Sequence, residues 1–268
     1  MSIRTVSGLY VTYDDHGTGR PLVLLHAFPL SAEMWRPQVE ALSKDFRVIA
    51  PNLRGFGGTS TFGDTPSVDG MAAAVAELLD ALSVTERVAL GGLSMGGYVA
   101  LAFTRKYPDR LRALILADTR AEPDDDAAKA NRDKQLHFLS GFTFSGPANL
   151  FDQLLPKMVS EGTRTRRPEV ADQLRSLAAV QHPGGVSDAL IALRDRPDAG
   201  PGLAKIDVPT LVIVGAEDAL TPPAMAQSLA GRITGAQLVT IPGAGHLSNV
   251  EKPDEFTDAV RRFLLGIT

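Results

Sequence analysis

The sequence contains no cysteine among its 268 residues. Disulfide bonds, thiolate nucleophiles and cysteine-ligated metal sites are therefore excluded. The net charge of −4 at pH 7 is small, so it gives no reason to expect a nucleic acid or a membrane surface as a partner. The histidines are scattered without a pair at metal-ligand spacing, and we expect neither a metal nor any other cofactor.

Long apolar runs are also missing. No apolar segment approaches the roughly 18 residues that a membrane span needs. The first residues, MSIRTVSGLYVTYDD, lack the apolar core of a signal peptide. We therefore expect a soluble, cytoplasmic protein. The composition, 44% hydrophobic and 22% charged, is typical of a globular protein with a large core. The oligomeric state stays open.

Short apolar segments alternate with helical patterns through most of the chain. Strands are predicted over residues 8–15, 21–28, 46–52, 87–92, 111–119, 209–218 and 236–245. Helices are predicted over residues 31–44, 67–83, 95–107, 222–233 and 253–266. Apolar strands separated by helices indicate an α/β fold, with a mostly parallel sheet that helices cover on both faces.

The segment 121–205 breaks this alternation. Helical stretches follow one another there, at about 125–139, 147–160, 168–181 and 186–194. We interpret the segment as a helical cap, or lid, inserted into an α/β core that residues 1–120 and 206–268 form. The cap is expected to stand over the carboxyl ends of the strands, where open α/β sheets bind their ligands.

The glycine-rich stretch VALGGLSMGGYVALAF, residues 88–103, carries the strongest chemical signal. A phosphate-binding loop is excluded because no Lys followed by Ser or Thr comes after the last glycine. The glycines also have the wrong spacing for a dinucleotide-binding turn. The remaining interpretations are a plain strand-to-helix turn and a nucleophile elbow, G-x-S-x-G, and the elbow is favoured. It makes Ser94 the candidate nucleophile.

A serine nucleophile needs a base to take its proton and an acid to orient that base. In the elbow class the chain order is serine, acid, histidine. His246, in a glycine-flanked loop before the last helix, fits the base. Asp218, at the end of a predicted strand, fits the acid, and Asp118 is the alternative because it also follows a strand.

The oxyanion formed in the reaction needs two backbone N–H donors. The residue after the nucleophile, Met95, is expected to supply one, and Phe28 in the loop LLHAFPL the other. His26 is expected to order this loop. Side chains expected to line the substrate pocket are His26, Trp35, Phe138 and Phe142. An aromatic on a helix face, such as Trp35, is more often part of the core.

These motifs, with NLRGFGGTS, KYPDRLRALIL and IPGAGHLSNVEKPDEF, resemble the α/β-hydrolase superfamily over nearly the whole chain. The chain is most similar to small capped esterases and 3-oxoadipate-type enol-lactonases, and more loosely to cofactor-free haloperoxidases and perhydrolases. The resemblance implies an eight-stranded sheet, a helical cap and a triad of Ser94, Asp218 and His246. Ala27 stands where the family usually has glycine, and Ser94 replaces the aspartate of haloalkane dehalogenases and epoxide hydrolases.

The sequence therefore predicts a serine hydrolase that cleaves a small-molecule ester or lactone through an acyl-enzyme. Alternatives are perhydrolysis or carbon–carbon bond hydrolysis with the same triad, and a non-hydrolytic ligand sensor on this fold. For an anionic substrate, Arg164, Arg166 and Arg167 of the cap are candidate clamps. A solvated loop before a helix is the favoured interpretation of that segment.

Overall fold

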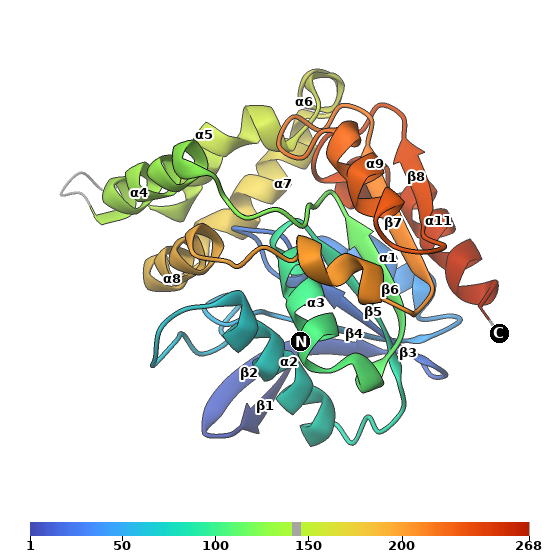
Figure 1. Cartoon of the computed structure of the whole chain (residues 1–268). Coiled ribbons are helices and arrows are strands. Elements are labelled where there is room, and N and C mark those ends of the chain that lie inside the picture. The colour runs from blue at the N-terminus through green and yellow to red at the C-terminus, as the bar shows by residue number, and fades with distance from the viewer. Residues whose placement is uncertain (141–145, 268) are drawn as a thin grey trace.

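The computed structural model describes residues 1–140 and 146–267 (Figure 1). An eight-stranded sheet has the order β1-β2-β4-β3-β5-β6-β7-β8. The strands are β1 (Ser2–Val6), β2 (Leu9–His16), β3 (Pro21–Leu25), β4 (Arg47–Pro51), β5 (Val88–Leu93), β6 (Leu111–Ala117), β7 (Thr210–Gly215) and β8 (Gln237–Ile241). Only the pairs β1–β2 and β2–β4 are antiparallel, which confirms the predicted mostly parallel sheet.

The strand β1 was not predicted from the sequence. It forms one edge of the sheet and pairs only with β2. Four of its five side chains are exposed, including Ile3 at 67%. An edge strand that buries so little has no apolar alternation for a sequence pattern to detect.

Helices cover both faces of the sheet, as the alternation of strands and helices predicts. The core helices are α1 (Arg36–Leu42), α2 (Val68–Ala81), α3 (Met95–Lys106), α9 (Pro223–Gly231), α10 (Ser248–Glu251) and α11 (Pro253–Leu265). Within β3, Val23 and Leu25 belong to the apolar cluster that contains residues of α2, α3 and α9. Leu22 and Leu24 belong to the cluster with residues of α1 and α11. Successive strand residues point to opposite faces, so each face has its own core.

Between β6 and β7 the chain forms α4 (Asp126–Ser140), α5 (Pro147–Met158), α6 (Glu161–Arg166), α7 (Pro168–Ala179) and α8 (Pro183–Arg194). We call these the inserted helices; Figure 1 shows them gathered at one end of the sheet. Four of them match predicted stretches. The short helix α6 corrects the expected solvated loop, because Ser160 caps its first turn by accepting a hydrogen bond from the Thr163 N–H at 3.2 Å. The boundaries 121–205 for a cap stay a prediction.

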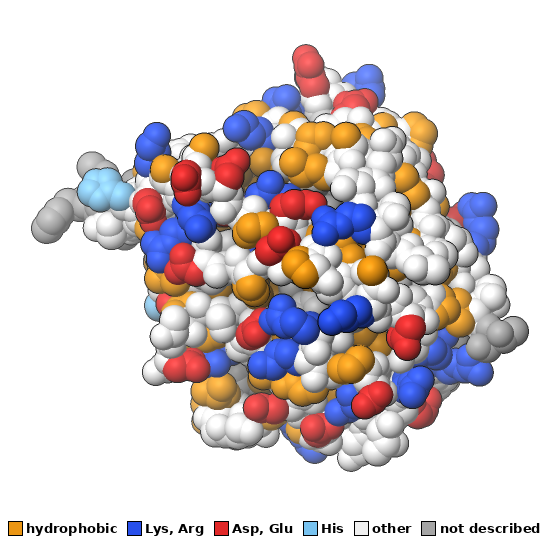
Figure 2. All heavy atoms as spheres, in the orientation of Figure 1, with side chains coloured by type: hydrophobic (Ala, Val, Ile, Leu, Met, Phe, Trp, Pro, Cys, Tyr) orange, Lys and Arg blue, Asp and Glu red, His pale blue; other side chains and the backbone are white. Residues whose placement is uncertain are grey.

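The surface carries mixed charges. Figure 2 shows Lys and Arg side chains interspersed with Asp and Glu on the face turned toward the viewer. Within residues 1–140 and 146–267, no helix is long and apolar enough to cross a membrane.

Trp35 lies in the core and not in a substrate pocket, which corrects the expectation from the sequence. Its side chain is 1% exposed, in the cluster that α1 and α11 share. Its ring packs against Phe256 of α11 with the ring centroids 5.7 Å apart. Trp35 ends the short 3-10 helix η1 (Ala32–Trp35) and therefore fastens the segment after β3 to the last helix.

We predict that Trp35→Ala lowers the free energy of unfolding by about 3–5 kcal/mol, because it empties a large buried site. Denaturant unfolding followed by circular dichroism measures this change without the tryptophan signal. The exposed aromatic Tyr10, 61% accessible on β2, is the control, and Tyr10→Ala should cost less than about 1 kcal/mol. Equal effects of the two substitutions would contradict the core assignment.

Candidate functional site

Ser94 occupies a sharp turn between β5 and α3. Its backbone φ of 54° lies in the left-handed region that residues other than glycine rarely adopt. A Cβ atom on Gly92 would lie 2.1 Å from the carbonyl oxygen of Gly96, and one on Gly96 would lie 2.1 Å from the carbonyl oxygen of Leu25. Only glycine fits at these two positions, so the elbow geometry explains the spacing of the motif.

A chain of hydrogen bonds starts at this turn. The Ser94 hydroxyl lies 2.8 Å from Nε2 of His246. The other ring nitrogen, Nδ1, lies 2.8 Å from Oδ2 of Asp218. Asp218 follows β7 and His246 follows β8, so two neighbouring strand ends deliver the two side chains to Ser94. The structure therefore brings together the three residues that the sequence singled out.

The Asp218 carboxylate is held from several sides. Its Oδ1 accepts hydrogen bonds from the backbone N–H groups of Leu220 and Thr221, at 2.8 and 2.9 Å. Its Oδ2 accepts from the Thr221 hydroxyl at 2.7 Å. Sequence reasoning missed Thr221, although a hydroxyl three residues after the acid is a signal for a local turn bond.

These contacts set the charges of the pair. Burial alone would raise the pKa of Asp218, but the His246 charge, the hydrogen bond to His246 and those from Thr221 together lower it. Burial would likewise lower the pKa of His246, but the charge and hydrogen bond of Asp218, with the charge of Glu251, raise it above 6.5. The site therefore favours an ionised carboxylate beside a basic imidazole.

Asp118, the alternative acid, lies at the end of β6 and is fully buried. It makes no hydrogen bond to His246 among the described residues; its partners are the Gly215 N–H at 2.8 Å and the Ser248 hydroxyl. Burial, and then the charge of Asp218, raise its pKa to about 8. The geometry thus favours Asp218 as the partner of His246 and leaves Asp118 protonated at neutral pH.

The two N–H groups predicted for an oxyanion lie at the same end of the sheet. Met95 is the first residue of α3, and Phe28 follows β3 in the loop that packs against Gly96. Neither N–H donates to a backbone or side-chain acceptor in the described part of the chain. Phe28, Ser94 and His246 line one cavity. Met95 is not among the lining residues, and the role of both N–H groups in catalysis stays a prediction.

His26 orders this loop, as predicted, but it does not reach the cavity. Its Nε2 accepts a hydrogen bond from the Leu53 N–H at 3.0 Å, and Nδ1 lies 3.0 Å from the Ala27 carbonyl oxygen. Burial lowers the pKa of His26 to about 4, so the ring is neutral and can accept at one nitrogen while it donates at the other. The expectation that His26 lines the pocket is corrected, because the side chain is fully buried.

The Ser94 cavity has a volume of about 250 Å³. Its lining residues are Phe28, Ser94, Tyr98, Arg120, Asp124, Ala128, Asn131, Arg132, Gln135, Leu154, Met158, Leu193, Leu220, Thr221 and His246. Most of the residues from Arg120 to Leu193 belong to the inserted helices or the segments that lead to them. Phe138 is not among the lining residues; it packs against the core cluster that contains α2 and α3. Phe142 lies outside the described residues.

The arginines of the segment TRTRRPE also lie away from this cavity. Arg164 donates to the Val159 carbonyl oxygen at 3.3 Å, and Arg167 donates to the Glu251 carbonyl oxygen at 2.7 Å. Arg166 is the last residue of α6, and its side chain is exposed. None of the three lines the cavity, so the structure argues against the alternative that these arginines clamp a carboxylate there. The arginines that do line it are Arg120 and Arg132.

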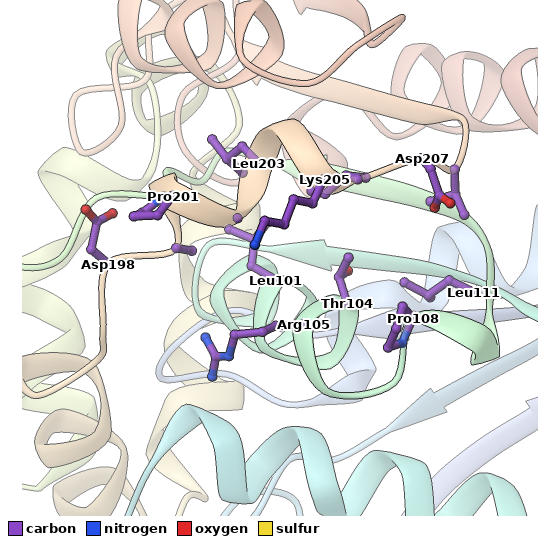
Figure 3. Close-up of a pocket in the computed structure, with 14 residues that line it drawn as sticks. Leu101, Thr104, Arg105, Pro108, Leu111, Asp198, Pro201, Leu203, Lys205 and Asp207 are labelled. Carbon is purple, nitrogen blue, oxygen red and sulfur yellow. The ribbon is translucent and has the colours of Figure 1, made fainter.

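A second cavity, of about 500 Å³, lies at the other end of α3. Its lining residues include Leu101, Thr104 and Arg105 of α3 and Leu203 and Lys205 of the 3-10 helix η3 (Gly200–Lys205), and Figure 3 shows Lys205 extending toward Leu101. It shares no lining residue with the Ser94 cavity. At 1.5 Å rise per residue, Thr104 lies roughly 15 Å along the helix from Ser94. This larger cavity is therefore distinct from the one that Ser94 lines.

Comparisons with known proteins agree on one family. The family model described as "alpha/beta hydrolase fold" matches residues 20–253. The structure of a thermophilic esterase from Thermogutta terrifontis, with malate bound, is 40% identical, with a TM-score of 0.94 over 99% of this chain and 98% of that one. The enol-lactonase structure from Burkholderia xenovorans LB400 is 29% identical, with a TM-score of 0.89 over 98% and 100%. A putative carbamate hydrolase RutD of Rhizobium rhizogenes is 30% identical over 94% of this chain and 97% of the relative.

The buried Asp118 makes stability depend on pH. Its folded-state pKa of about 8 exceeds the ordinary value of 3.8, so the folded state holds its proton more tightly than the unfolded state. This contribution to stability is complete below pH 3.8 and is lost as the pH rises through 8. We predict that Asp118→Asn, which cannot ionise, gains stability relative to wild type as the pH rises from 5 to 8, by on the order of 1 kcal/mol per pH unit. Denaturant unfolding at several pH values measures it, and a pH-independent difference would refute it.

Proposed function

Because the chain belongs to the alpha/beta hydrolase fold family, we propose that it is a serine hydrolase that cleaves a small carboxylic ester or lactone through an acyl-enzyme on Ser94. The observation that carries this proposal is the unbroken line of hydrogen bonds from the Ser94 hydroxyl through His246 to Asp218. A ligand sensor on the same fold needs neither the line of hydrogen bonds nor the strained turn, so both features favour catalysis over the sensor.

The geometry gives each residue one task. His246 Nε2 takes the proton of the Ser94 hydroxyl as its oxygen attacks the carbonyl carbon. The developing oxyanion accepts hydrogen bonds from the N–H groups of Met95 and Phe28. His246 then returns the proton to the leaving alcohol oxygen, and the same nitrogen activates the water that releases the acid. Asp218 holds the imidazole in one tautomer and stabilises its cation.

The inserted helices set the size of the substrate. We propose that residues 121–205 form the cap of the site, because side chains of α4, α5 and α8 close the cavity above Ser94. A volume of about 250 Å³ is below the usual range for drug-sized ligands. The cavity therefore fits a short acyl chain, which is consistent with the esterase and the enol-lactonase among the similar structures.

We predict that Ser94→Ala lowers kcat for p-nitrophenyl butyrate by on the order of 10⁶-fold, because no other nucleophile replaces the serine. Release of p-nitrophenol measures the rate, and esters from acetate to decanoate report the acyl preference, which should favour the short chains. Circular dichroism of the variant checks that it folds. Turnover of the variant within tenfold of wild type would refute a role for Ser94.

The pH dependence of kcat/KM at acidic pH tests the protonation state of His246. Only the neutral imidazole accepts the Ser94 proton, and the contacts of Asp218 raise the pKa of His246 above 6.5. We therefore predict that kcat/KM for a p-nitrophenyl ester falls as the pH is lowered, with an inflection above 6.5. Asp218→Asn removes the negative charge and should move this inflection to lower pH. An inflection that does not shift in the variant would assign the titration to another group.

A further inference from the structure

The helix α4 turns a polar face to the Ser94 cavity. Four of its residues line the cavity, at positions i, i+3, i+4 and i+7: Ala128, Asn131, Arg132 and Gln135. This spacing places them on one side of the helix. The other walls include the apolar side chains Leu154, Met158, Leu193 and Leu220. A cavity with one charged wall and apolar walls beside it fits a short carbon chain that ends in a charged group.

The charge of the polar wall comes from arginines that share one carboxylate. Oδ1 of Asp124 accepts from Arg120 and from Arg196, each at 2.7 Å, and Oδ2 accepts from Arg132 at 3.1 Å. Burial would raise the pKa of Asp124, but the charges and hydrogen bonds of Arg196 and Arg132 keep it below 3.8. Three guanidinium groups thus surround a single ionised carboxylate, and the cluster carries an excess of positive charge.

Two of these arginines line the cavity and have donors left over. Arg196 lies behind the wall, 2% exposed, with its guanidinium 4.1 Å above the Tyr98 ring. Arg120 and Arg132 are part of the lining, with side chains 19% and 21% exposed. Each makes one hydrogen bond within the described part of the chain, whereas a guanidinium has five N–H donors. The remaining donors are available to a molecule in the cavity.

Gln135 marks the same wall as a surface for a ligand. Its side chain is buried, and its Oε1 has no hydrogen-bond partner in the described structure. Buried side-chain amides nearly always have a partner, in the protein or in a bound molecule. Gln135 lies one turn after Arg132 on α4, so a molecule bound to the arginine is within reach of the amide. Oε1 can only accept, from an N–H or O–H of that molecule, whereas an ionised carboxylate can pair only with the amide N–H groups.

From these contacts we propose that Arg132 and Arg120, beside Gln135, form a carboxylate subsite, and that the preferred substrate is an ester or lactone whose acyl chain carries a second, free carboxylate. The arginines already bind the carboxylate of Asp124, so their placement suits this planar anion. The inference rests on the proposed hydrolytic function, which the test below separates from it.

The test uses matched pairs of esters that differ in charge. Monomethyl esters of succinic, glutaric, adipic and suberic acid carry one free carboxylate, and the dimethyl ester of each acid is the neutral probe of nearly equal size. Release of methanol at pH 7.5 gives kcat/KM for each. At the best chain length we expect the monoester to exceed the diester, per ester group, by about tenfold or more, the value of a hydrogen bond to a charged group.

Three variants test whether the preference for the monoester comes from the polar wall that α4 forms in the Ser94 cavity. Arg132→Gln should abolish the preference by lowering kcat/KM of the monoester while changing that of the diester less than about twofold, and Arg132→Lys should restore part of it. Arg175→Gln is the control, since it also removes one positive charge and one Asp–Arg pair from the inserted helices, at an exposed site outside the cavity. It should leave the preference unchanged.

The outcomes separate the two proposals. The subsite is refuted if no monoester is preferred, or if Arg132→Gln lowers both kinds of ester equally, which would show that Arg132 only supports the fold of α4. If no ester of either kind is hydrolysed, the hydrolytic function fails. Calorimetric titration of adipate into Ser94→Ala then decides the subsite: binding at least fivefold weaker after Arg132→Gln supports it, and equal or no binding overturns it.

Discussion

The site depends on the close contact between the first turn of α3 and the end of β3. Gly96 packs against the Leu25 carbonyl so closely that no side chain fits. The Ser94 backbone is held in its strained conformation by hydrogen bonds, from its N–H to the Ala117 carbonyl at 2.9 Å and from the Thr119 hydroxyl to its carbonyl at 3.0 Å. Neighbouring strands thus fix a turn that an isolated segment would not adopt. The same contact brings the loop after β3, with the N–H group of Phe28, to the cavity that Ser94 lines.

The second constraint is electrostatic. Two carboxylates, Asp118 and Asp218, are buried at the ends of neighbouring strands, and a single histidine lies beside them. Asp218 receives two N–H groups, a hydroxyl and the imidazole, so its ionised form is stabilised. Among the described residues the side chain of Asp118 has two hydrogen-bond partners, and burial with the charge of Asp218 keeps it protonated below a pH of about 8. The number of donors that each oxygen meets therefore decides which carboxylate serves His246.

The sequence predicts those parts of the structure that residues close together in the chain determine. The apolar strands, the elbow around Ser94 and the strand-end positions of Asp218 and His246 follow from patterns within a few residues. The edge strand β1 is not predicted because its side chains are exposed and its stability comes from pairing with β2. The pocket aromatics show the limit most clearly. Trp35 is an aromatic residue of the kind that often lines pockets. It lies in the core because it packs against Phe256, which is more than 200 residues away in sequence.

The polar wall could not be predicted for a related reason. Arg120 and Asp124, before α4, and Arg132, on α4, are ordinary charged residues, for which solvation is the default interpretation. Arg196, which completes their cluster, comes from the far end of the inserted helices. Only the fold shows that one carboxylate joins both ends of the insertion in the lining of the cavity that contains Ser94. In the proposed subsite, an anion meets the remaining donors of the guanidinium groups that also hold Asp124. Recognition of a charged substrate and placement of α4 beside the cavity would therefore depend on the same arginines.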